Sequence, residues 1–219
     1  MYIKDIKKDI PERVYDILEK EIDELRPCQE KSIKKGLLKG KNILVCTPTA
    51  SGKTLCAELA FTKNIMERKG KAVYVVPLKA LASEKFNSFK EKYPFIRTAL
   101  SIGDIDSADP YLIDYDLIIT TSEKFDSLIR HKASWLSHIA LVIFDEIHLL
   151  NDPGRGPTLE IVITILRKLL KNIQIVGLSA TIGNPEQFAE WLDAELVEDK
   201  WRPVKLHKGI YLNGKIEFQ

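Results

Sequence analysis

A short stretch of small residues, Cys46–Leu55 (CTPTASGKTL), most constrains what this chain can fold into. It follows the apolar run Asn42–Val45 and opens into the helix-like pattern Leu55–Ala60. A turn of small residues between a strand and a helix directs several backbone N–H groups and the positive end of the helix at one point, which favours an anion. Lys53 adds a cation for outer phosphates, and the Thr54 hydroxyl suits Mg²⁺. The stretch therefore predicts a nucleotide phosphate loop.

This phosphate loop departs from the usual pattern at its first position, where Thr47 replaces glycine. The departure makes the bare pattern less specific, and a polar loop with a chance Gly-Lys-Thr is the alternative. A partner acid elsewhere in the chain would decide between the two. The predicted nucleotide-binding residues are Pro48, Thr49, Ala50, Ser51, Gly52, Lys53 and Thr54.

The composition limits the class of protein. With 219 residues, 45% of them hydrophobic and 29% charged, the chain fits one well-buried, soluble domain. Its net charge of +2 means that any nucleic-acid contact must come from a local patch. The three cysteines form no Cys-x-x-Cys pair, which argues against a disulfide framework or a structural zinc site and suits a cytoplasmic location. Apolar runs such as Ile139–Phe144 are too short to cross a bilayer, and we expect no membrane contact.

Apolar runs and helix-like patterns alternate along most of the chain. Continuous Val/Ile/Leu runs joined by helices predict an α/β domain whose parallel β-sheet is flanked by helices on both faces. The predicted strands are Asn42–Cys46, Ala72–Val76, Thr98–Ile102, Leu117–Thr120, Leu141–Phe144 and Ile173–Leu178. The predicted helices are Pro11–Leu18, Pro27–Leu38, Thr54–Glu67, Leu78–Lys92, Glu123–Lys132, Pro157–Leu170 and Pro185–Leu192. Ligands of such sheets bind at the carboxyl ends of the strands, where the phosphate loop lies.

Two consecutive acids, Asp145 and Glu146, follow a buried apolar strand and supply the partner that the phosphate loop needs. Burying two carboxylates together is costly unless a cation or a proton-transfer task compensates. Asp145 is suited to hold Mg²⁺ through water, and Glu146 is suited to polarise an attacking water as a general base. The alternative is a pair of solvated turn residues. His148 has no second His or Cys at ligand spacing, so it is not an obvious metal ligand.

A third signal, Ser179-Ala180-Thr181, follows another apolar strand. Alone it is a common loop sequence. Its two hydroxyls could hydrogen-bond His148 or Asp145 and so report the state of a bound nucleotide.

Together these residues resemble the first motor domain of superfamily-two DExH-box helicases. Thr47–Thr54 is similar to motif I, Asp145–His148 to motif II and Ser179–Thr181 to motif III. Gln29 resembles the adenine-reading Q motif, and Pro77–Lys85 resembles motif Ia. Residues 101–104 (SIGD) and 120–124 (TTSEK) resemble the strand-contacting motifs. Short segments resemble the Ski-like branch, and within it archaeal HELQ-type DNA-repair helicases. They are Ser134–Leu136, Asp145–Leu150, Asp152–Pro157 and Trp201–Val204.

The resemblance implies a RecA-like P-loop NTPase domain of an ATP-dependent DNA helicase that moves 3′ to 5′ on single-stranded DNA and acts in repair at forks. It implies that Lys53 and Thr54 bind phosphates and Mg²⁺, that Asp145 holds Mg²⁺ and that Glu146 activates water. His148, Ser179 and Thr181 would couple hydrolysis to movement. The candidate nucleic-acid contacts are Lys79, Lys85, Gly103, Thr121, Ser122, Lys124 and Arg155.

On this basis residues 1–40 are N-terminal helices with the Q motif, 41–200 form the ATP-binding domain, and 201–219 form a connection with a hairpin turn at Asn213-Gly214. Nothing in the chain matches the Gln-x-x-Gly-Arg-x-x-Arg pattern of the second RecA-like domain. We therefore expect that domain to lie in the same longer polypeptide, the whole to be monomeric, and this chain alone to bind ATP but unwind poorly. An RNA helicase of the same branch and an ATP-dependent clamp or remodeller remain alternatives, as does a non-helicase P-loop ATPase, against which the ordered motifs argue.

Overall fold

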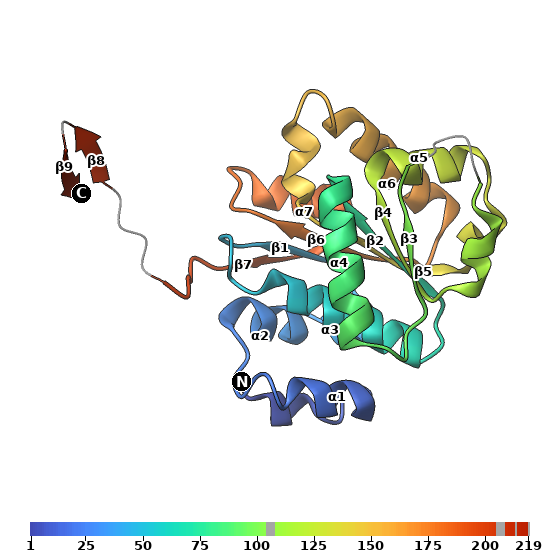
Figure 1. Cartoon of the computed structure of the whole chain (residues 1–219), viewed down its shortest axis with the longest axis horizontal. Helices are drawn as coiled ribbons and strands as arrows, with labels where there is room; N and C mark the ends of the chain where they lie inside the picture. Colours follow the sequence, from blue (N-terminus) through green and yellow to red (C-terminus); the bar gives the residue numbers. More distant parts are fainter. Residues whose placement is uncertain (104–107, 205–208, 213, 219) are drawn as a thin grey trace.

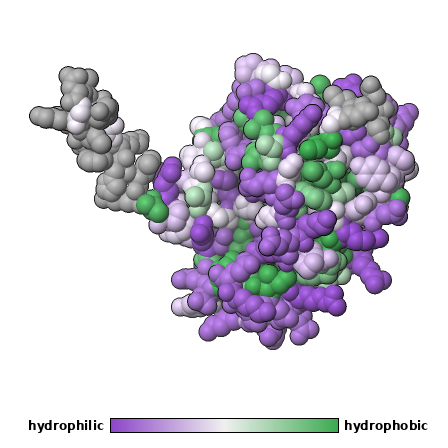
Figure 2. Space-filling view, in the orientation of Figure 1, coloured by the Kyte–Doolittle hydropathy of each residue, from purple (hydrophilic) through white to green (hydrophobic). Residues whose placement is uncertain are grey.

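The structure is a computed structural model that describes residues 1–103, 108–204, 209–212 and 214–218. Two residues of the predicted motifs, Asp104 and Asn213, lie outside the described residues. Among the helices that are described, none is long and apolar enough to cross a membrane. Hydrophilic residues cover most of the face seen in Figure 2, with apolar ones scattered among them.

One seven-stranded parallel sheet organises the chain (Figure 1), with the strand order β3-β4-β2-β5-β6-β1-β7. Its strands are β1 Ile43–Cys46, β2 Lys71–Val76, β3 Thr98–Ser101, β4 Leu117–Thr121, β5 Ile139–Phe144, β6 Gln174–Ser179 and β7 Glu195–Glu198. This confirms the predicted α/β class. The strand β7, which pairs with β1, was not predicted, because its sequence Glu-Leu-Val-Glu is short and charged at both ends.

Helices cover both faces of the sheet (Figure 1). They are α1 Glu12–Leu18, α2 Pro27–Lys34, α3 Lys53–Met66, α4 Lys79–Lys92, α5 Ser122–Arg130, α6 Gly156–Leu169 and α7 Pro185–Leu192. The short 3₁₀ helices are η1 Ile3–Ile6, η2 Leu37–Lys39, η3 Pro110–Asp114, η4 Ser134–His138 and η5 Ile147–Asn151. The predicted helix Pro27–Leu38 is thus interrupted, because Gly36 adopts the left-handed conformation with φ 103° and starts η2.

The alternation of side chains along each strand separates two hydrophobic cores. Ile43 and Val45 of β1 pack in a core with residues of α1 to α4, whereas Leu44 and Cys46 pack in a core with residues of α5 to α7. Such alternation is the period-two geometry of a strand buried on both faces. Leu18 and Leu25 lie in the first core, so the N-terminal segment packs on the main sheet and its helices.

The end of the chain forms a separate two-stranded sheet. Strands β8 (Gly209–Leu212) and β9 (Lys215–Phe218) pair antiparallel. Gly214 in the turn has φ 81°, a conformation that glycine adopts without strain. The two strands flank the predicted turn, whose residue Asn213 lies outside the described residues.

Candidate nucleotide site

The phosphate loop connects the carboxyl end of β1 to the first turn of α3. At Gly52 the side chains of Gln29 and Arg26 come close to the loop backbone. Gly52 has φ 94°, and a Cβ there would lie 2.5 Å from Gln29 Nε2 and 2.8 Å from Arg26 Cδ. Ala50 also has a positive φ, 63°. The loop therefore needs glycine at position 52 both for its backbone conformation and for the space beside it.

Thr47, the residue that departs from the usual loop pattern, has a structural partner. Its buried hydroxyl lies 2.7 Å from the Ser51 hydroxyl, which closes the loop from within. Its N–H donates to the carbonyl oxygen of Ser179 at 3.2 Å, so the loop is tied to the end of β6. A glycine could supply the second contact but not the first.

The Lys53 ammonium lies inside the loop. It donates to the carbonyl oxygens of Thr47 at 2.9 Å and of Pro48 at 3.1 Å. Both acceptors are neutral carbonyl groups, so neither competes as an anion with an incoming phosphate. Because it sits at the positive end of α3, this ammonium is well placed for an anion.

Gln29 lies beside the loop and supports its backbone. Its Nε2 donates to the Gly52 carbonyl at 2.9 Å, and its Oε1 accepts from the Arg26 N–H at 2.8 Å. The guanidinium of Arg26 donates to the Ala50 carbonyl at 2.7 Å and lies over the Trp201 ring at 5.5 Å. Both ends of the Gln29 amide are thus engaged with backbone in this structure. The sequence reasoning missed Arg26 and Trp201, whose signal was their place directly beside predicted motifs.

The carboxylate of Asp145 is held at both oxygens at the end of β5. Tyr74, from the neighbouring strand β2, donates its hydroxyl to Oδ2 at 2.8 Å. The Glu146 N–H donates to Oδ1 at 3.0 Å, and the Asp145 N–H donates to the Val75 carbonyl at 2.8 Å. Burial, with the charge of Asp145 second, raises the pKa of Tyr74 well above its usual value, so the phenol stays protonated and donates. The sequence reasoning missed Tyr74, the one hydroxyl inside the apolar strand β2.

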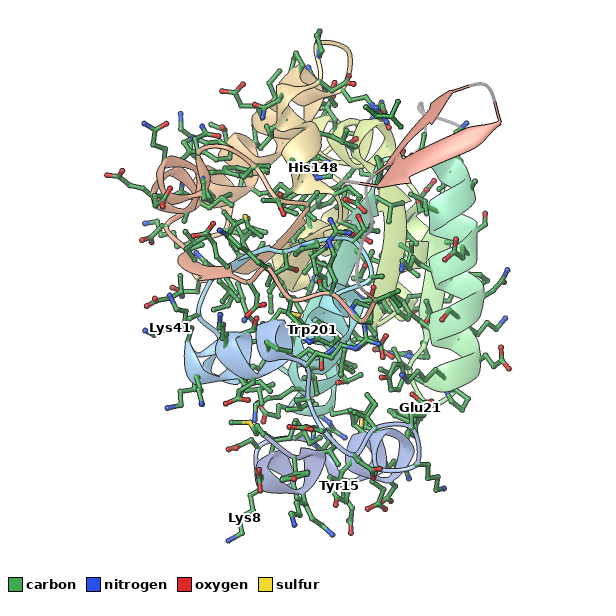
Figure 3. All side chains as sticks on the ribbon, turned by 90° about the vertical axis from the view of Figure 1, so that its left-hand side faces the viewer. Lys8, Tyr15, Glu21, Lys41, His148 and Trp201 are labelled. Carbon is green, nitrogen blue, oxygen red and sulfur yellow. The ribbon has the colours of Figure 1, made fainter. Side chains whose placement is uncertain are left out.

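Glu146 and His148 lie on the turn that follows. Glu146 adopts the left-handed conformation with φ 52°, and its side chain is 39% exposed. The His148 Nδ1 lies 3.4 Å from Glu146 Oε2 and accepts a hydrogen bond from the Ala180 N–H at 3.3 Å. A non-glycine residue in this conformation at a strand end is typical of functional sites. Figure 3 shows His148 and Trp201 on the same face of the domain.

The contact between His148 and the Ser-Ala-Thr segment differs from the predicted one. The Ala180 backbone N–H meets His148, whereas the buried Ser179 hydroxyl donates to the Ala180 carbonyl at 2.8 Å. Thr181 is exposed. The predicted contact through a hydroxyl is therefore wrong. Ser179 still belongs to β6 and its side chain is buried, so only the backbone of the next residue reaches the turn.

The candidate nucleic-acid residues differ in exposure. Lys79 is exposed at the start of α4, and Lys85 is half-buried on the same helix. Gly103 has φ 111° and open space where a Cβ would be. Arg155 is half-buried and forms an ion pair with Asp152 at 3.2 Å. These residues can still present a cation or a backbone group to a ligand.

The residues around the start of α5 are buried. Thr121 and Ser122 are 4% and 5% exposed, and the Thr121 hydroxyl accepts from the Lys124 N–H as the helix cap. The Lys124 ammonium lies 3.2 Å from Asp109 Oδ2, with 3% of its side chain exposed. The prediction of Lys124 as a surface contact is therefore wrong. Its side chain turns inward because a buried carboxylate from a distant loop compensates its charge.

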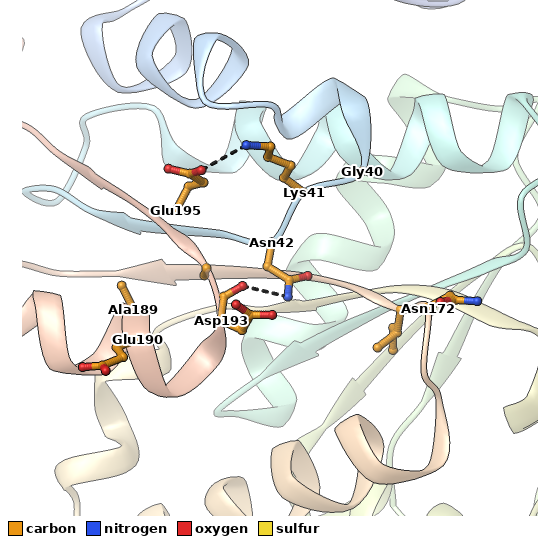
Figure 4. Close-up of a pocket in the computed structure, with 10 residues that line it drawn as sticks. Gly40, Lys41, Asn42, Asn172, Ala189, Glu190, Asp193 and Glu195 are labelled. Carbon is orange, nitrogen blue, oxygen red and sulfur yellow. Dashed lines mark hydrogen bonds and ion pairs between the residues drawn. The ribbon is translucent and has the colours of Figure 1, made fainter.

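A hollow of about 630 Å³ lies at the opposite end of the sheet (Figure 4). Two of its polar side chains have partners within the protein. Lys41 pairs with Glu195 at 3.0 Å, and the Asn42 amide donates to the Asp193 carbonyl at 3.1 Å. This hollow is therefore a weaker candidate than the phosphate loop.

The donor groups fit Mg²⁺ better than a transition metal. The part of the chain that the structure describes holds no cluster of three or more His, Cys, Asp or Glu side chains that could bind a metal ion. Asp145 and Thr54 would instead offer one carboxylate and one hydroxyl. Mg²⁺ is usually bound by one or two carboxylates together with phosphate oxygens and water.

The fold and this site define a P-loop nucleotide-binding domain. The profile of the DEAD/DEAH box helicase family matches residues 26–188. The chain belongs to this family.

Relatives with a narrower description cover nearly the whole chain. It is 51% identical to the ATP-dependent DNA helicase Hel308 of Pyrococcus abyssi over 94% of the chain and 29% of that relative. It is 55% identical to the ATP-dependent DNA helicase Hel308 of Methanocaldococcus jannaschii over 90% of the chain and 17% of that relative. The chain thus spans less than a third of the length of these curated relatives.

Solved structures show a similar fold. The DUF1998 helicase MrfA bound to DNA has a TM-score of 0.75 and 28% identity over 88% of this chain and 30% of that one. MrfA bound to DNA and AMPPNP has a TM-score of 0.76 and 29% identity over the same shares.

Proposed function

We propose that this chain is the ATP-binding motor domain of an ATP-dependent DNA helicase. One observation carries the proposal: the end of β6 joins the phosphate loop to the acidic turn. The Ser179 carbonyl accepts from the Thr47 N–H, and the next residue donates its N–H to His148. A change at the phosphate loop thereby has a continuous path of hydrogen bonds to the turn that carries Glu146.

The residues of the site divide the chemistry among them. Lys53 binds the outer phosphates, and Asp145 and Thr54 would hold Mg²⁺, which would neutralise phosphate charge. Glu146, exposed and next to the fixed Asp145, accepts the proton of the attacking water. His148 and Ser179 connect this turn to the phosphate loop, Ser179 through its backbone. A coupling role for Thr181 is proposed on the resemblance to the family alone.

DNA lies, in this proposal, across the carboxyl end of the sheet and is contacted by Lys79, Lys85, Gly103 and Arg155, whereas the buried Thr121 and Ser122 shape the start of α5 beneath this surface. Contacts from lysine, arginine and backbone groups bind phosphates, so little sequence preference is expected. The relatives' description as ATP-dependent DNA helicases favours DNA over RNA. A role in repair at forks is proposed on the resemblance to the family. We propose 3′-to-5′ movement on the resemblance to the family alone.

The complete enzyme would be longer than this chain. A second RecA-like domain in the same polypeptide would supply arginines to the site, and we propose a monomer that acts in the cytoplasm. The three cysteines are free in the structure, which fits a reducing compartment. Without an arginine finger, turnover falls by about a thousandfold or more in comparable sites, so this chain binds ATP and unwinds poorly.

Binding of a fluorescent ATP analogue to this chain tests the nucleotide site. Lys53→Ala removes the only cation seen inside the loop among the described residues, and we expect affinity to fall at least tenfold. Lys41→Ala, at the other end of the sheet, is the matched control and should bind normally. Equal binding by Lys53→Ala and the unmodified chain would contradict the proposed site.

The substrate is tested with the full-length protein. ATP hydrolysis should rise when single-stranded DNA is added and rise less with RNA. Preferential stimulation by RNA would favour the RNA-helicase alternative, and stimulation without strand separation would favour a clamp or remodeller. Robust unwinding by the 219-residue chain alone would refute the need for a second domain.

A further inference from the structure

A buried tyrosine outside the recognised motifs contacts the acidic turn. Tyr74 lies in the middle of β2, is fully buried, and donates its hydroxyl to Asp145 Oδ2 at 2.8 Å. It stands in register with Ile143 of β5, two residues before Asp145. The parallel pairing of β2 and β5 thus places the phenol beneath the carboxylate.

The hydrogen bond from Tyr74 restricts the orientation of the Asp145 carboxylate. The Glu146 N–H holds the other oxygen, Oδ1, at 3.0 Å, so each oxygen of Asp145 has a donor from a different direction. The two donors together set the plane of the carboxylate before any cation binds. Groups that orient a metal ligand in this way are needed for full metal affinity.

The ring of Tyr74 is itself fixed by α4. It packs edge to face on Phe89, with ring centroids 5.3 Å apart. The helix α4 starts at Lys79, one of the proposed DNA contacts. Tyr74 thereby lies between the helix that would contact DNA and the carboxylate that would hold the cation.

The same aromatic cluster holds a second buried tyrosine that serves as a reference. Tyr93 donates its hydroxyl to Glu58 Oε2 at 2.6 Å, and its ring packs edge to face on Phe61. Phe61 in turn packs on Phe89. Tyr93 therefore matches Tyr74 in burial, ring packing and a carboxylate acceptor, but its acceptor lies in α3 and not at the acidic turn.

We propose that Tyr74 is a positioning residue that orients Asp145 for the divalent cation of the bound nucleotide. The proposal rests on the proposed nucleotide site. Tyr74 touches neither nucleotide nor cation and acts through Asp145 alone. Its hydroxyl, and not its bulk, carries this role.

The test is a Mg²⁺ titration of the binding of a fluorescent, non-hydrolysable ATP analogue to this chain. Tyr74→Phe keeps the ring and removes the hydroxyl. We expect the half-saturating Mg²⁺ concentration to rise about tenfold, the lower end of the loss seen when such orienting groups are removed. Binding of the analogue without Mg²⁺ should stay unchanged, because Lys53 and the loop are intact.

Two controls separate positioning from a structural effect. Tyr93→Phe should leave the half-saturating Mg²⁺ concentration unchanged, although it also loses a buried hydrogen bond. In an Asp145→Asn background, Tyr74→Phe should have no further effect on Mg²⁺, because the two residues act as one unit. Thermal melts of all variants without ligand report their folding independently.

The outcomes distinguish this inference from the proposed function. An unchanged or lower half-saturating Mg²⁺ concentration in Tyr74→Phe, or an equal rise in Tyr93→Phe, would overturn the positioning role and leave the nucleotide site standing. A Tyr74→Phe chain that fails to fold would also overturn it, because the hydroxyl would then serve the fold. Absence of Mg²⁺-dependent binding in the unmodified chain would instead overturn the proposed function.

Discussion

The two ends of the sheet hold polar groups in opposite ways. At the amino end, Asn42 uses its amide on both sides, donating to the Asp193 carbonyl and accepting from the Ile175 N–H. Lys41 pairs with Glu195 in solvent (Figure 4). At the carboxyl end, Lys53 donates to two neutral carbonyl groups, and Glu146 is part-exposed on a strained turn. Asn42 and Lys41 thus have partners within the protein, whereas the Lys53 ammonium and the Glu146 carboxylate are placed to meet a ligand.

Backbone strain differs between the ends in the same way. Gly40 and Asp193 have positive φ at the amino end, where each caps the end of a helix. This is the usual place for the left-handed conformation. Ala50 and Glu146 have positive φ at the carboxyl end, and neither lies at the C-terminal end of a helix; Glu146 instead precedes the first residue of η5. Their strain is therefore associated with the site, as expected where a ligand must be held.

The largest effect is expected at Glu146. Glu146→Gln in the full-length protein should lower ATP hydrolysis by about 10²- to 10⁴-fold, because the amide cannot accept the proton of water. Nucleotide affinity should change little, since the side chain volume is kept. Single-turnover hydrolysis and analogue binding measure the two quantities. Wild-type turnover in this variant would remove Glu146 from the role of general base.

The buried Lys124 tests whether every charge at the carboxyl end serves binding. Lys124→Met should lower the free energy of unfolding by about 3 kcal/mol, because Asp109 keeps a buried charge without this partner. The exposed Lys79→Met should leave unfolding unchanged and weaken DNA binding instead. Chemical denaturation and a DNA-binding titration at two salt concentrations check both. A stable Lys124→Met chain with weaker DNA binding would restore Lys124 to the contact surface.

Two glycines compare the ends directly. Gly52→Ala should cost about 2 kcal/mol or more, because an alanine adds a clash with Gln29 and Arg26 to the cost of the positive φ. Gly40→Ala, with nothing within 4 Å of the new Cβ, should cost only about 1 kcal/mol. Thermal unfolding gives the stability, and analogue binding should fall for Gly52→Ala alone. Equal losses at both positions would mean that the close approach at Gly52 is not needed.

The smallest effect is expected at Lys41. Lys41→Ala removes a pair in which both side chains are largely exposed, 58% and 43%, and such surface pairs contribute little to stability. The melting temperature and nucleotide binding should both stay as in the unmodified chain. A clear loss of nucleotide binding would show that the amino end takes part in the site after all.

Much of the fold could be predicted from local patterns. Six strands of the main sheet follow from apolar runs, and their predicted bounds differ from the observed ones by one or two residues. The seventh, β7, could not be predicted because its pairing with β1 alone makes it a strand. The order of the strands in the sheet could not be predicted either, since it depends on contacts between residues far apart in the chain.

The candidate site likewise has parts that are local in the sequence and parts that depend on packing. The phosphate loop and the acidic turn are each a few consecutive residues whose chemistry depends on local spacing, and the sequence by itself determined them. Their connection through Thr47 and Ser179 depends on the pairing of β1 with β6.

What only the tertiary structure decided is which side chains meet across strands. Tyr74 reaches Asp145 because β2 and β5 are neighbours in a fixed register, although 71 positions separate the two residues. Lys124 is buried because Asp109 arrives from another loop. The sequence therefore determined which chemical groups are present and where each strand ends. The folded structure decided which of those groups are oriented, buried or free to bind, because burial and register arise only when distant segments pack together.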